Sequence, residues 1–168
     1  IGAPEYDNTN TAGGKVYVYY GSATGPSATP NWTKEEYSGF LLSERFGSSV
    51  ATAGDVNGDG YSDLIVGART YTTNVFLTWS QGKAFVYHGS AAGLSATPNS
   101  TPDDANQVSA GFGWSVASAG DVNGDGYSDV IIGAPNYDDG ANTGEGRAFV
   151  YYGSAAGLSA TPNSTPDD

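Results

Sequence analysis

The sequence predicts an all-β protein built from repeated four-stranded units, the architecture of a β-propeller. The first observation is a repeat, because Phe46-Gly47 returns as Phe112-Gly113 and Asp55 returns as Asp121 at the same spacing. The second is composition, since 25 Gly and 12 Tyr residues favour short strands and tight turns. The third is the lack of helical periodicity, with Phe40–Phe46 as the only place where one short helical turn is expected.

Each repeat unit is expected to contain four strands. The second strand is a short apolar run of the kind buried on both faces of a sheet, and the third is rich in aromatic and β-branched residues. Proline in the weak fourth strand suits an edge, where a missing N–H costs little. In order within a unit, the strands are Gly47–Ala53 and Gly113–Ala119; Asp63–Ala68 and Asp129–Ala134; Lys15–Tyr20, Lys83–His88 and Arg147–Tyr152; and segments near Ala28–Thr33, Ala96–Thr101 and Ala160–Thr165. Variable polar loops join the second and third strands at Glu5–Gly14, Arg69–Gln81 and Asn136–Glu145.

The strand count predicts about two and three-quarter four-stranded blades in this chain. Residues 1–38 form a partial blade that holds strands two to four, and residues 39–104 and 105–168 form complete blades. Because a closed ring needs at least four blades, we expect the chain to be a segment of a larger propeller or to complete itself with another copy.

A nine-residue loop joins the first and second strands in both complete blades, at residues 55–63 and 121–129. Oxygen-bearing side chains occupy positions 1, 3, 5 and 9, and glycines at positions 4 and 6 let the backbone turn sharply. Three carboxylates brought together would repel one another without a cation, and Ca²⁺ prefers such oxygen ligands. Two Ca²⁺ sites are therefore predicted, with side-chain ligands and the position 7 carbonyl in each. The ligands are Asp55, Asn57, Asp59, Tyr61 and Asp63 in one site, and Asp121, Asn123, Asp125, Tyr127 and Asp129 in the other.

Two other interpretations of these loops exist. A metal-free turn is one, because Asp, Asn and Gly favour turns in any case. An EF-hand is the other, but it needs a glutamate at position 12, where this chain has Val66 and Ile132.

Phe112-Gly113, the aspartate-rich loop, and Ile132-Gly133-Ala134-Pro135 follow one another in the order and spacing that resemble the FG-GAP repeat of integrin α-subunit β-propellers and their bacterial and archaeal relatives. The resemblance covers essentially the whole chain, with Arg69 standing where the motif has proline. It implies a seven-bladed propeller, calcium in the loop between strands one and two, an extracellular or cell-surface location, and ligand binding on the opposite face. The chain contains no Arg-Gly-Asp sequence.

The predicted function is that of an extracellular, non-catalytic, calcium-binding module for cell adhesion, surface structure or protein assembly. A formal charge of −12 argues against nucleic acid as a partner, and no apolar run reaches the roughly 18 residues of a membrane span. The variable loops are expected to bind a protein or glycan ligand, and a neighbouring copy could donate a missing strand. The alternatives are a carbohydrate-binding module that uses Trp79, and a non-catalytic appendage of a secreted enzyme.

Several further residues invite a specific interpretation. Asn31, Asn99 and Asn163 head Asn-x-Ser/Thr sequons at equivalent places, which predicts either glycosylation or a polar turn duplicated with the repeat. His88 is the only histidine, so a strand-end packing role is expected rather than zinc binding or nucleophilic catalysis. Trp114 is expected to pack in the core between blades.

Overall fold

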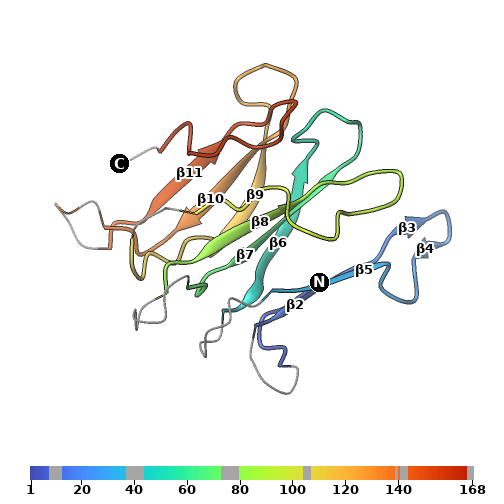
Figure 1. The fold of residues 1–168 in the computed structure, drawn as a ribbon, viewed down its shortest axis with the longest axis horizontal. Coiled ribbons are helices and arrows are strands. Elements are labelled where there is room, and N and C mark those ends of the chain that lie inside the picture. The colour runs from blue at the N-terminus through green and yellow to red at the C-terminus, as the bar shows by residue number, and fades with distance from the viewer. Residues whose placement is uncertain are drawn as a thin grey trace.

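The computed structural model describes residues 1–7, 13–36, 44–72, 80–103, 107–138, 140 and 144–165, and contains no helix within these ranges. The described chain is all-β, as predicted, and its strands lie side by side in a fan (Figure 1). The strands are β1 (Gly2–Ala3), β2 (Lys15–Val18), β3 (Gly21–Ser22), β4 (Gly25–Pro26), β5 (Trp32–Glu35), β6 (Phe46–Gly54), β7 (Asp63–Ala68), β8 (Lys83–Tyr87), β9 (Ser115–Gly120), β10 (Asp129–Ala134) and β11 (Arg147–Tyr151).

The strands form three antiparallel three-stranded sheets. The first sheet has the order β1-β2-β5, the second β6-β7-β8 and the third β11-β10-β9, and β3 and β4 form a separate hairpin. The second and third sheets share a register, because Leu64 pairs with Tyr87 and Val130 with Tyr151. Strand β6 lies against β9 of the following sheet and against β1 and β2 of the preceding sheet.

The second sheet contributes to two hydrophobic cores. Ile65 and Val86 belong to the core shared with the third sheet, whereas Val66, Phe85 and Tyr87 belong to the core shared with the first. Neighbouring residues of β7 and β8 therefore point to opposite cores, as the two-residue period of a strand requires. This double burial explains the unbroken apolar run of β7.

The phenylalanine of each Phe-Gly pair fastens one sheet to the preceding one. Phe46 is fully buried, packs edge-to-face on Phe85 at 5.4 Å, and donates its N–H to the Gly13 carbonyl at 2.9 Å. The glycine after it allows close approach in the next repeat, because a Cβ on Gly113 would stand 2.5 Å from the Lys83 carbonyl oxygen. A side chain there would force the sheets apart.

The first three predicted strands of each unit that the chain contains form close to their predicted bounds, and the fourth strand is the main exception. Strands β7 and β10 have the predicted bounds, and a fourth strand forms in the first sheet as β5. In the other two units the pairing shrinks to single bridges, Val86 with Ser100 and Val150 with Ser164. In the second unit Pro102 stands where β5 has Lys34, and it lacks the N–H that would extend the ladder.

Trp114 lies outside the core, contrary to the prediction. Its side chain is 49% exposed, and the Arg69 guanidinium stacks over its ring at 4.2 Å. The reason is positional, because β9 begins only at Ser115, so that Trp114 lies at the rim before the strand. Phe40–Phe46 lies mostly outside the described residues, and Phe46 itself starts β6. The predicted boundaries after residues 38 and 104 also lie outside them.

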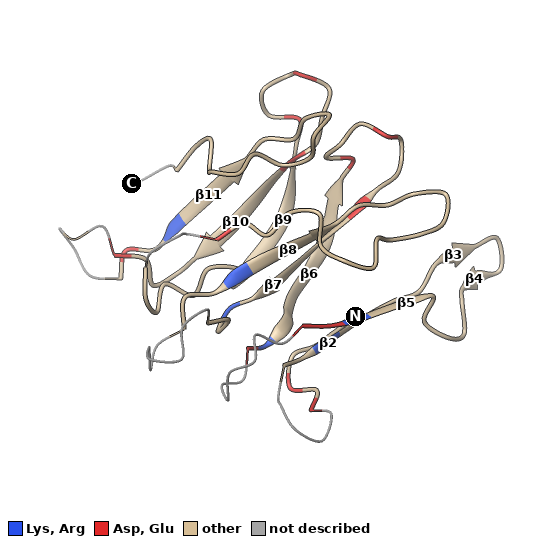
Figure 2. Ribbon diagram, viewed as in Figure 1, with Lys and Arg blue, Asp and Glu red and all other residues tan. Residues whose placement is uncertain are grey.

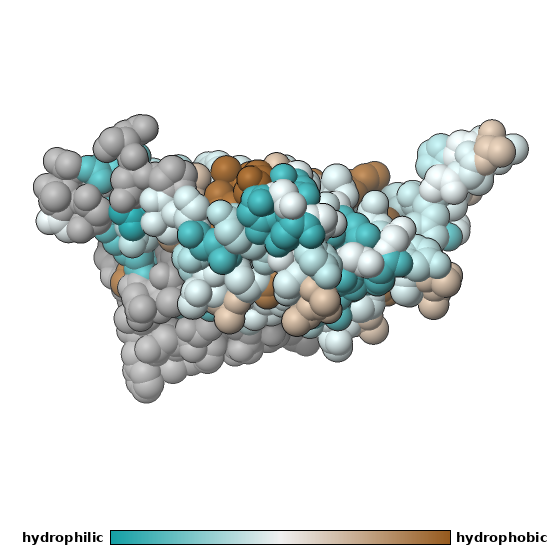
Figure 3. Space-filling model, turned by 90° about the horizontal axis from the view of Figure 1, so that it is seen from above, coloured by the Kyte–Doolittle hydropathy of each residue, from teal (hydrophilic) through white to brown (hydrophobic). Residues whose placement is uncertain are grey.

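Basic side chains lie mainly at the end of the strands away from the aspartate-rich loops, whereas acidic side chains are present at both ends. The aspartate-rich loops lie at one end of the sheets, whereas Lys15, Lys83 and Arg147 open β2, β8 and β11 at the opposite end (Figure 2). The face seen in Figure 3 is mostly hydrophilic, and its apolar residues form small separate patches. Among the described residues, no helix is long and apolar enough to span a membrane.

Candidate metal centre

The first aspartate of each nine-residue loop organises the turn. In the second sheet, Asp55 Oδ1 accepts the N–H groups of Gly58 at 2.7 Å and Asp59 at 3.0 Å, and Oδ2 accepts that of Gly60 at 2.8 Å. Both glycines have positive φ, 73° and 86°, which other residues adopt at a cost. The loop of the third sheet repeats these bonds around Asp121.

Positions 3 and 5 are linked to each other. Asn57 Oδ1 accepts the Asp59 N–H at 3.1 Å, and its Nδ2 donates to Asp59 Oδ2 at 2.9 Å. Asp59 Oδ1 also accepts the Tyr61 N–H at 2.9 Å. The Tyr61 N–H, and next the Asn57 amide, lower the pKa of the Asp59 carboxyl, so this group is anionic at neutral pH. Asn123, Asp125 and Tyr127 form the same arrangement in the other loop.

The aspartate at position 9 has a different environment from the others. Asp63 is 2% exposed, and its two oxygens accept the N–H groups of Val56 at 2.9 Å and Gly89 at 2.7 Å. Asp129 is also buried and accepts those of Val122 and Gly153. Burial raises the pKa of the Asp63 carboxyl despite the two N–H donors. This carboxylate ties the loop to the end of the third strand of its own sheet.

The donor set suits a hard cation in its chemistry. Positions 1, 5 and 9 offer carboxylates and position 3 an amide oxygen, and an oxygen that accepts one N–H keeps a second lone pair for a metal. Within the described ranges, however, no three His, Cys, Asp or Glu side chains converge closely enough to hold an ion together. The loops are instead closed by amide hydrogen bonds.

The first loop is also bound to the sheet that follows it. Ser128 donates its N–H to the Asp55 carbonyl at 2.9 Å and accepts the Asp55 N–H on Oγ at 3.1 Å. Ser154 donates its N–H to the Val56 carbonyl at 3.0 Å. Gly58 lies under the Tyr127 ring, since a Cβ there would stand 2.6 Å from Cε1. These contacts between sheets were not predicted, because they join residues far apart in the sequence and no local pattern indicates them.

The second loop has no such cover among the described residues. Val56 is fully buried, whereas its counterpart Val122 is 54% exposed. A Cβ on Gly124 would meet no atom within 4 Å, in contrast to one on Gly58. The two loops share one sequence, so this difference comes from the packing of a following sheet on the first loop alone.

His88 lies at the end of β8, as predicted for a strand-end residue, and also contacts the first loop. Its Nδ1 lies 3.3 Å from Nδ2 of Asn57. Its ring also contacts the third sheet, because a Cβ on Gly157 would stand 3.1 Å from Cε1. This contact between His88 and the loop was not predicted from the sequence. The neighbouring Gly89 also contacts the loop, because its N–H donates to Asp63.

The side chains of the three sequon asparagines stabilise the turns after the third strands by hydrogen bonds. Asn31, Asn99 and Asn163 accept the N–H groups of Tyr20, His88 and Tyr152 at 2.8, 2.9 and 2.8 Å. Each also accepts a hydroxyl from a serine four residues earlier. These bonds account for the asparagine in every unit without a glycan, and glycosylation of the exposed side chains stays a prediction. Trp79 lies outside the described residues.

Adjacent antiparallel sheets, fastened by Phe-Gly pairs and carrying aspartate-rich loops at one end, define a β-propeller repeat protein. The FG-GAP repeat model matches residues 46–87 and 112–151. The chain belongs to the FG-GAP repeat family.

Similar proteins include several integrin α subunits. Mouse integrin alpha-IIb is 34% identical over 139 residues, which cover 80% of this chain and 13% of that protein. Integrin alpha-4 of Xenopus laevis is 32% identical over 157 residues, covering 94% of this chain and 14% of the relative. Integrin alpha pat-2 of Caenorhabditis briggsae is 43% identical over 94 residues, covering 54% and 7% respectively. The chain thus spans a small part of the length of these relatives.

Proposed function

We propose that this chain is an extracellular, non-catalytic FG-GAP propeller module that binds two Ca²⁺ ions and serves adhesion, surface structure or protein assembly. The observation that carries the proposal is the duplicated aspartate-rich loop in a chain that is similar to integrin α subunits. The side chains at positions 1, 3, 5 and 9 of this loop offer carboxylate or amide oxygens to a metal. The similarity supports an adhesion-related role, and the millimolar calcium outside cells suits a loop of modest affinity.

In each loop, calcium would be held by the side chains of positions 1, 3, 5 and 9 and by the carbonyl of position 7, with position 9 placed by its buried amide hydrogen bonds. The cation supplies positive charge that offsets the clustered carboxylates. The residues themselves already set the turn, because Asp55 binds three loop N–H groups. Calcium is therefore expected to stiffen a loop that is largely formed, and through Asp55 and Val56 to strengthen its hold on the third sheet.

Isothermal titration of the chelator-treated chain with CaCl₂ tests this function. Two ions are expected per chain, with a Kd on the order of 10⁻⁴ M. At about 2 mM Ca²⁺ this gives about 1.8 kcal/mol of stabilisation per site, seen as a higher melting temperature. Asp59→Ala and Asp125→Ala are each expected to remove one site, whereas Glu145→Ala, which removes an exposed carboxylate outside both loops, leaves both. Identical melting curves with CaCl₂ and with EDTA would contradict the proposal.

We also propose that the ligand is a protein or a glycan bound at the rim opposite the loops. That rim carries stacked pairs of a cation and an aromatic ring, Arg69 over Trp114 and Arg147 over Tyr137, both at 4.2 Å. Such surfaces suit stacking and polar recognition. Trp114→Ala is expected to weaken ligand capture on protein or glycan arrays without lowering the melting temperature. Self-association by strand donation is the remaining proposal for partners, and native mass spectrometry measures it.

A further inference from the structure

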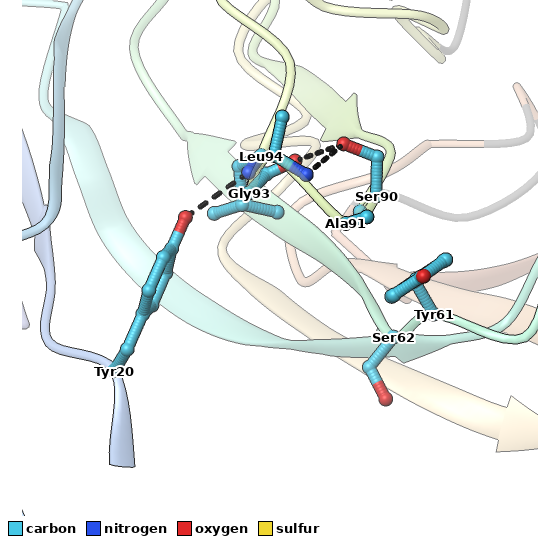
Figure 4. A pocket seen from close by; sticks show the side chains of 9 residues that line it. Tyr20, Tyr61, Ser62, Ser90, Ala91, Gly93 and Leu94 are labelled. Carbon is cyan, nitrogen blue, oxygen red and sulfur yellow. Dashed lines mark hydrogen bonds between the residues drawn. The ribbon is translucent and has the colours of Figure 1, made fainter. Parts of the chain in front are cut away.

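The two junctions between sheets differ at their loop ends. At the first junction the Tyr20 hydroxyl accepts the N–H of Leu94 at 3.1 Å, beside a pocket of about 330 Å³ that Tyr61 and Ser62 also line (Figure 4). At the second junction the residues that correspond to Tyr61 and Ser62 contact the first loop. The polar groups at this end of a junction therefore serve the packing of one repeat on another.

The opposite rim holds two residues that depart from the repeat. Arg69 stands where the other two repeats have Pro4 and Pro135. Trp114 stands where the second repeat has Ser48. The repeat does not need either large side chain, because smaller residues fill the same positions elsewhere in the chain. Packing of the second sheet on the third nevertheless brings the two side chains together.

The Arg69 guanidinium has an aromatic neighbour but no anionic one among the described residues. Its central carbon lies 4.2 Å from the centre of the Trp114 ring. Within the described ranges no carboxylate lies at ion-pair distance from it, whereas Lys15 and Lys83 on the same rim each pair with one. The loop that follows, residues 70–81, contains no acidic residue. Arg69 is thus a cation without a counter-ion in the part of the chain that the structure describes.

The terminal nitrogens of this guanidinium are available to a ligand. Nε of Arg69 is buried without a hydrogen-bond partner, whereas Nη1 and Nη2, which have no partner among the described residues either, are not buried. Stacking leaves the N–H groups, which lie in the guanidinium plane, free to donate. The outer end of the side chain therefore presents two parallel donors, the arrangement that fits a carboxylate.

An amide side chain stands beside the same ring. Nδ2 of Asn136 and Cε3 of Trp114 lie 3.7 and 3.6 Å from the point where a Cβ on Gly111 would stand. Asn136 is exposed, and Trp114 is 49% exposed. An amide offers one donor and one acceptor to a peptide group. The rim therefore places a cation and a main-chain partner on either side of one aromatic ring.

These groups favour a protein partner over a sugar. A sugar binds an aromatic residue by stacking on an open ring face, and the guanidinium already covers one face of Trp114. A peptide needs no ring face, because its acidic side chain bonds to the guanidinium and its main chain bonds to an amide. Gln107 pairs in this way with the main chain of Asp138 on the same rim, accepting its N–H and donating to its carbonyl.

We propose that Arg69 and Trp114 form a binding site for an aspartate or glutamate side chain of a protein partner. The terminal nitrogens of Arg69 donate two hydrogen bonds to the carboxylate, Trp114 holds the guanidinium in place, and Asn136 bonds to the adjoining main chain. Recognition is by contact rather than by long-range attraction, since the chain as a whole carries a charge of −12. This inference rests on the ligand binding proposed for this rim and does not require calcium.

NMR of the full chain labelled with ¹⁵N tests the proposal, because the Arg69 Nε–H and the Trp114 indole N–H give separate signals. The probe is the peptide acetyl-Gly-Ser-Glu-Ser-Gly-amide, and its glutamine analogue is the matched control ligand. Saturable shifts of both signals are expected with the glutamate peptide, with a Kd on the order of 10⁻³ M. The glutamine peptide is expected to bind at least tenfold more weakly, because it lacks the charge.

Variants of the chain separate the roles of the two residues. Arg69→Pro restores the residue of the other repeats, so it is expected to keep the melting curve and to weaken binding at least tenfold. Arg69→Lys keeps the charge without the paired donors and is expected to bind with intermediate affinity. Trp114→Ser is expected to weaken binding about fivefold, and Trp114→Phe to recover most of it. Arg147→Gln is the matched control, expected to change binding less than twofold, because Arg147 stacks on Tyr137 at the same 4.2 Å but has a further partner.

Absence of saturable shifts, equal binding of the two peptides, or unchanged binding to Arg69→Pro would overturn the proposal. Tighter binding of glucuronic acid than of the glutamate peptide would overturn it as well, because the ligand would then be a sugar acid. Ligand capture on arrays that requires Trp114 but not Arg69 would refute the carboxylate site and leave the proposed function of the rim intact. Calorimetry that finds no calcium, together with intact peptide binding, would refute only the proposed calcium sites.

Discussion

Replacing Asp63 with alanine separates the structural role of the loop from its role in binding metal. The carboxylate accepts the N–H groups of Val56 and Gly89, and all three residues are buried. A hydrogen bond to a charged group contributes about 1.5–3 kcal/mol. Losing two such bonds costs about 3–6 kcal/mol, partly offset because the buried carboxylate is itself unfavourable, as its raised pKa indicates. The expected net loss is about 3 kcal/mol in the free energy of unfolding, present even in EDTA.

Urea unfolding followed by tryptophan fluorescence measures this loss, in EDTA and in CaCl₂. Asp59→Ala is the matched control, because Asp59 lies exposed in the same loop; its effect is expected to be small in EDTA and larger in CaCl₂. Asp63→Asn keeps one acceptor oxygen and is expected to lose about half as much as alanine. The reasoning fails if Asp63→Ala is harmless in EDTA, or if both alanine variants lose the same stability there.

Three further predictions follow from the packing of the sheets. Gly67→Ala places a Cβ 2.0 Å from a carbonyl oxygen of the third sheet and is expected to cost about 1–3 kcal/mol, whereas Gly133→Ala meets chiefly a serine hydroxyl and is expected to cost less in the same urea titration. Val56→Ser is expected to destabilise the chain by about 2 kcal/mol because Val56 is fully buried, and Val122→Ser by far less, as differential scanning calorimetry would reveal. Burial and a hydrogen-bonded carboxylate raise the pKa of Tyr87; the folded form stays neutral where the unfolded form ionises, so stability is full below about pH 10 and falls above it. Alkaline urea titrations of the parent and of Tyr87→Phe would reveal a steeper fall for the parent.

Local patterns were sufficient to predict the inner strands and the loops. The bounds of β7 and β10 were predicted from apolar runs that end in Gly-Ala, and in β7 burial on both faces makes every residue part of that signal. The turn geometry was predictable from Asp55, Gly58 and Gly60, since their hydrogen bonds and positive φ angles depend on neighbours within the loop.

Features that depend on distant residues could not be predicted from local sequence patterns. In the second unit the fourth strand is reduced to a single bridge, because Pro102 has no N–H to donate. The effect of that missing donor depends on which residue Pro102 faces in the sheet. Trp114 was placed wrongly because a large aromatic residue near an apolar strand favours the core, yet Arg69 stacks on it at the rim. The hydrogen bond from the Gly89 N–H to Asp63 and the one from the Asp55 N–H to Ser128 join residues far apart in the sequence. No rule of residue spacing predicts them.

The hydrogen bonds from the third sheet to the first loop link two neighbouring repeats. The N–H groups of Ser128 and Ser154 donate to carbonyls of the preceding repeat, so their hydrogen-exchange rates report on a loop that is not their own. Loosening of the first loop therefore exposes these two amides of the third sheet. Because Ser128 itself belongs to the second nine-residue loop, the two loops are coupled, and loosening of either one weakens the junction between the second and third sheets.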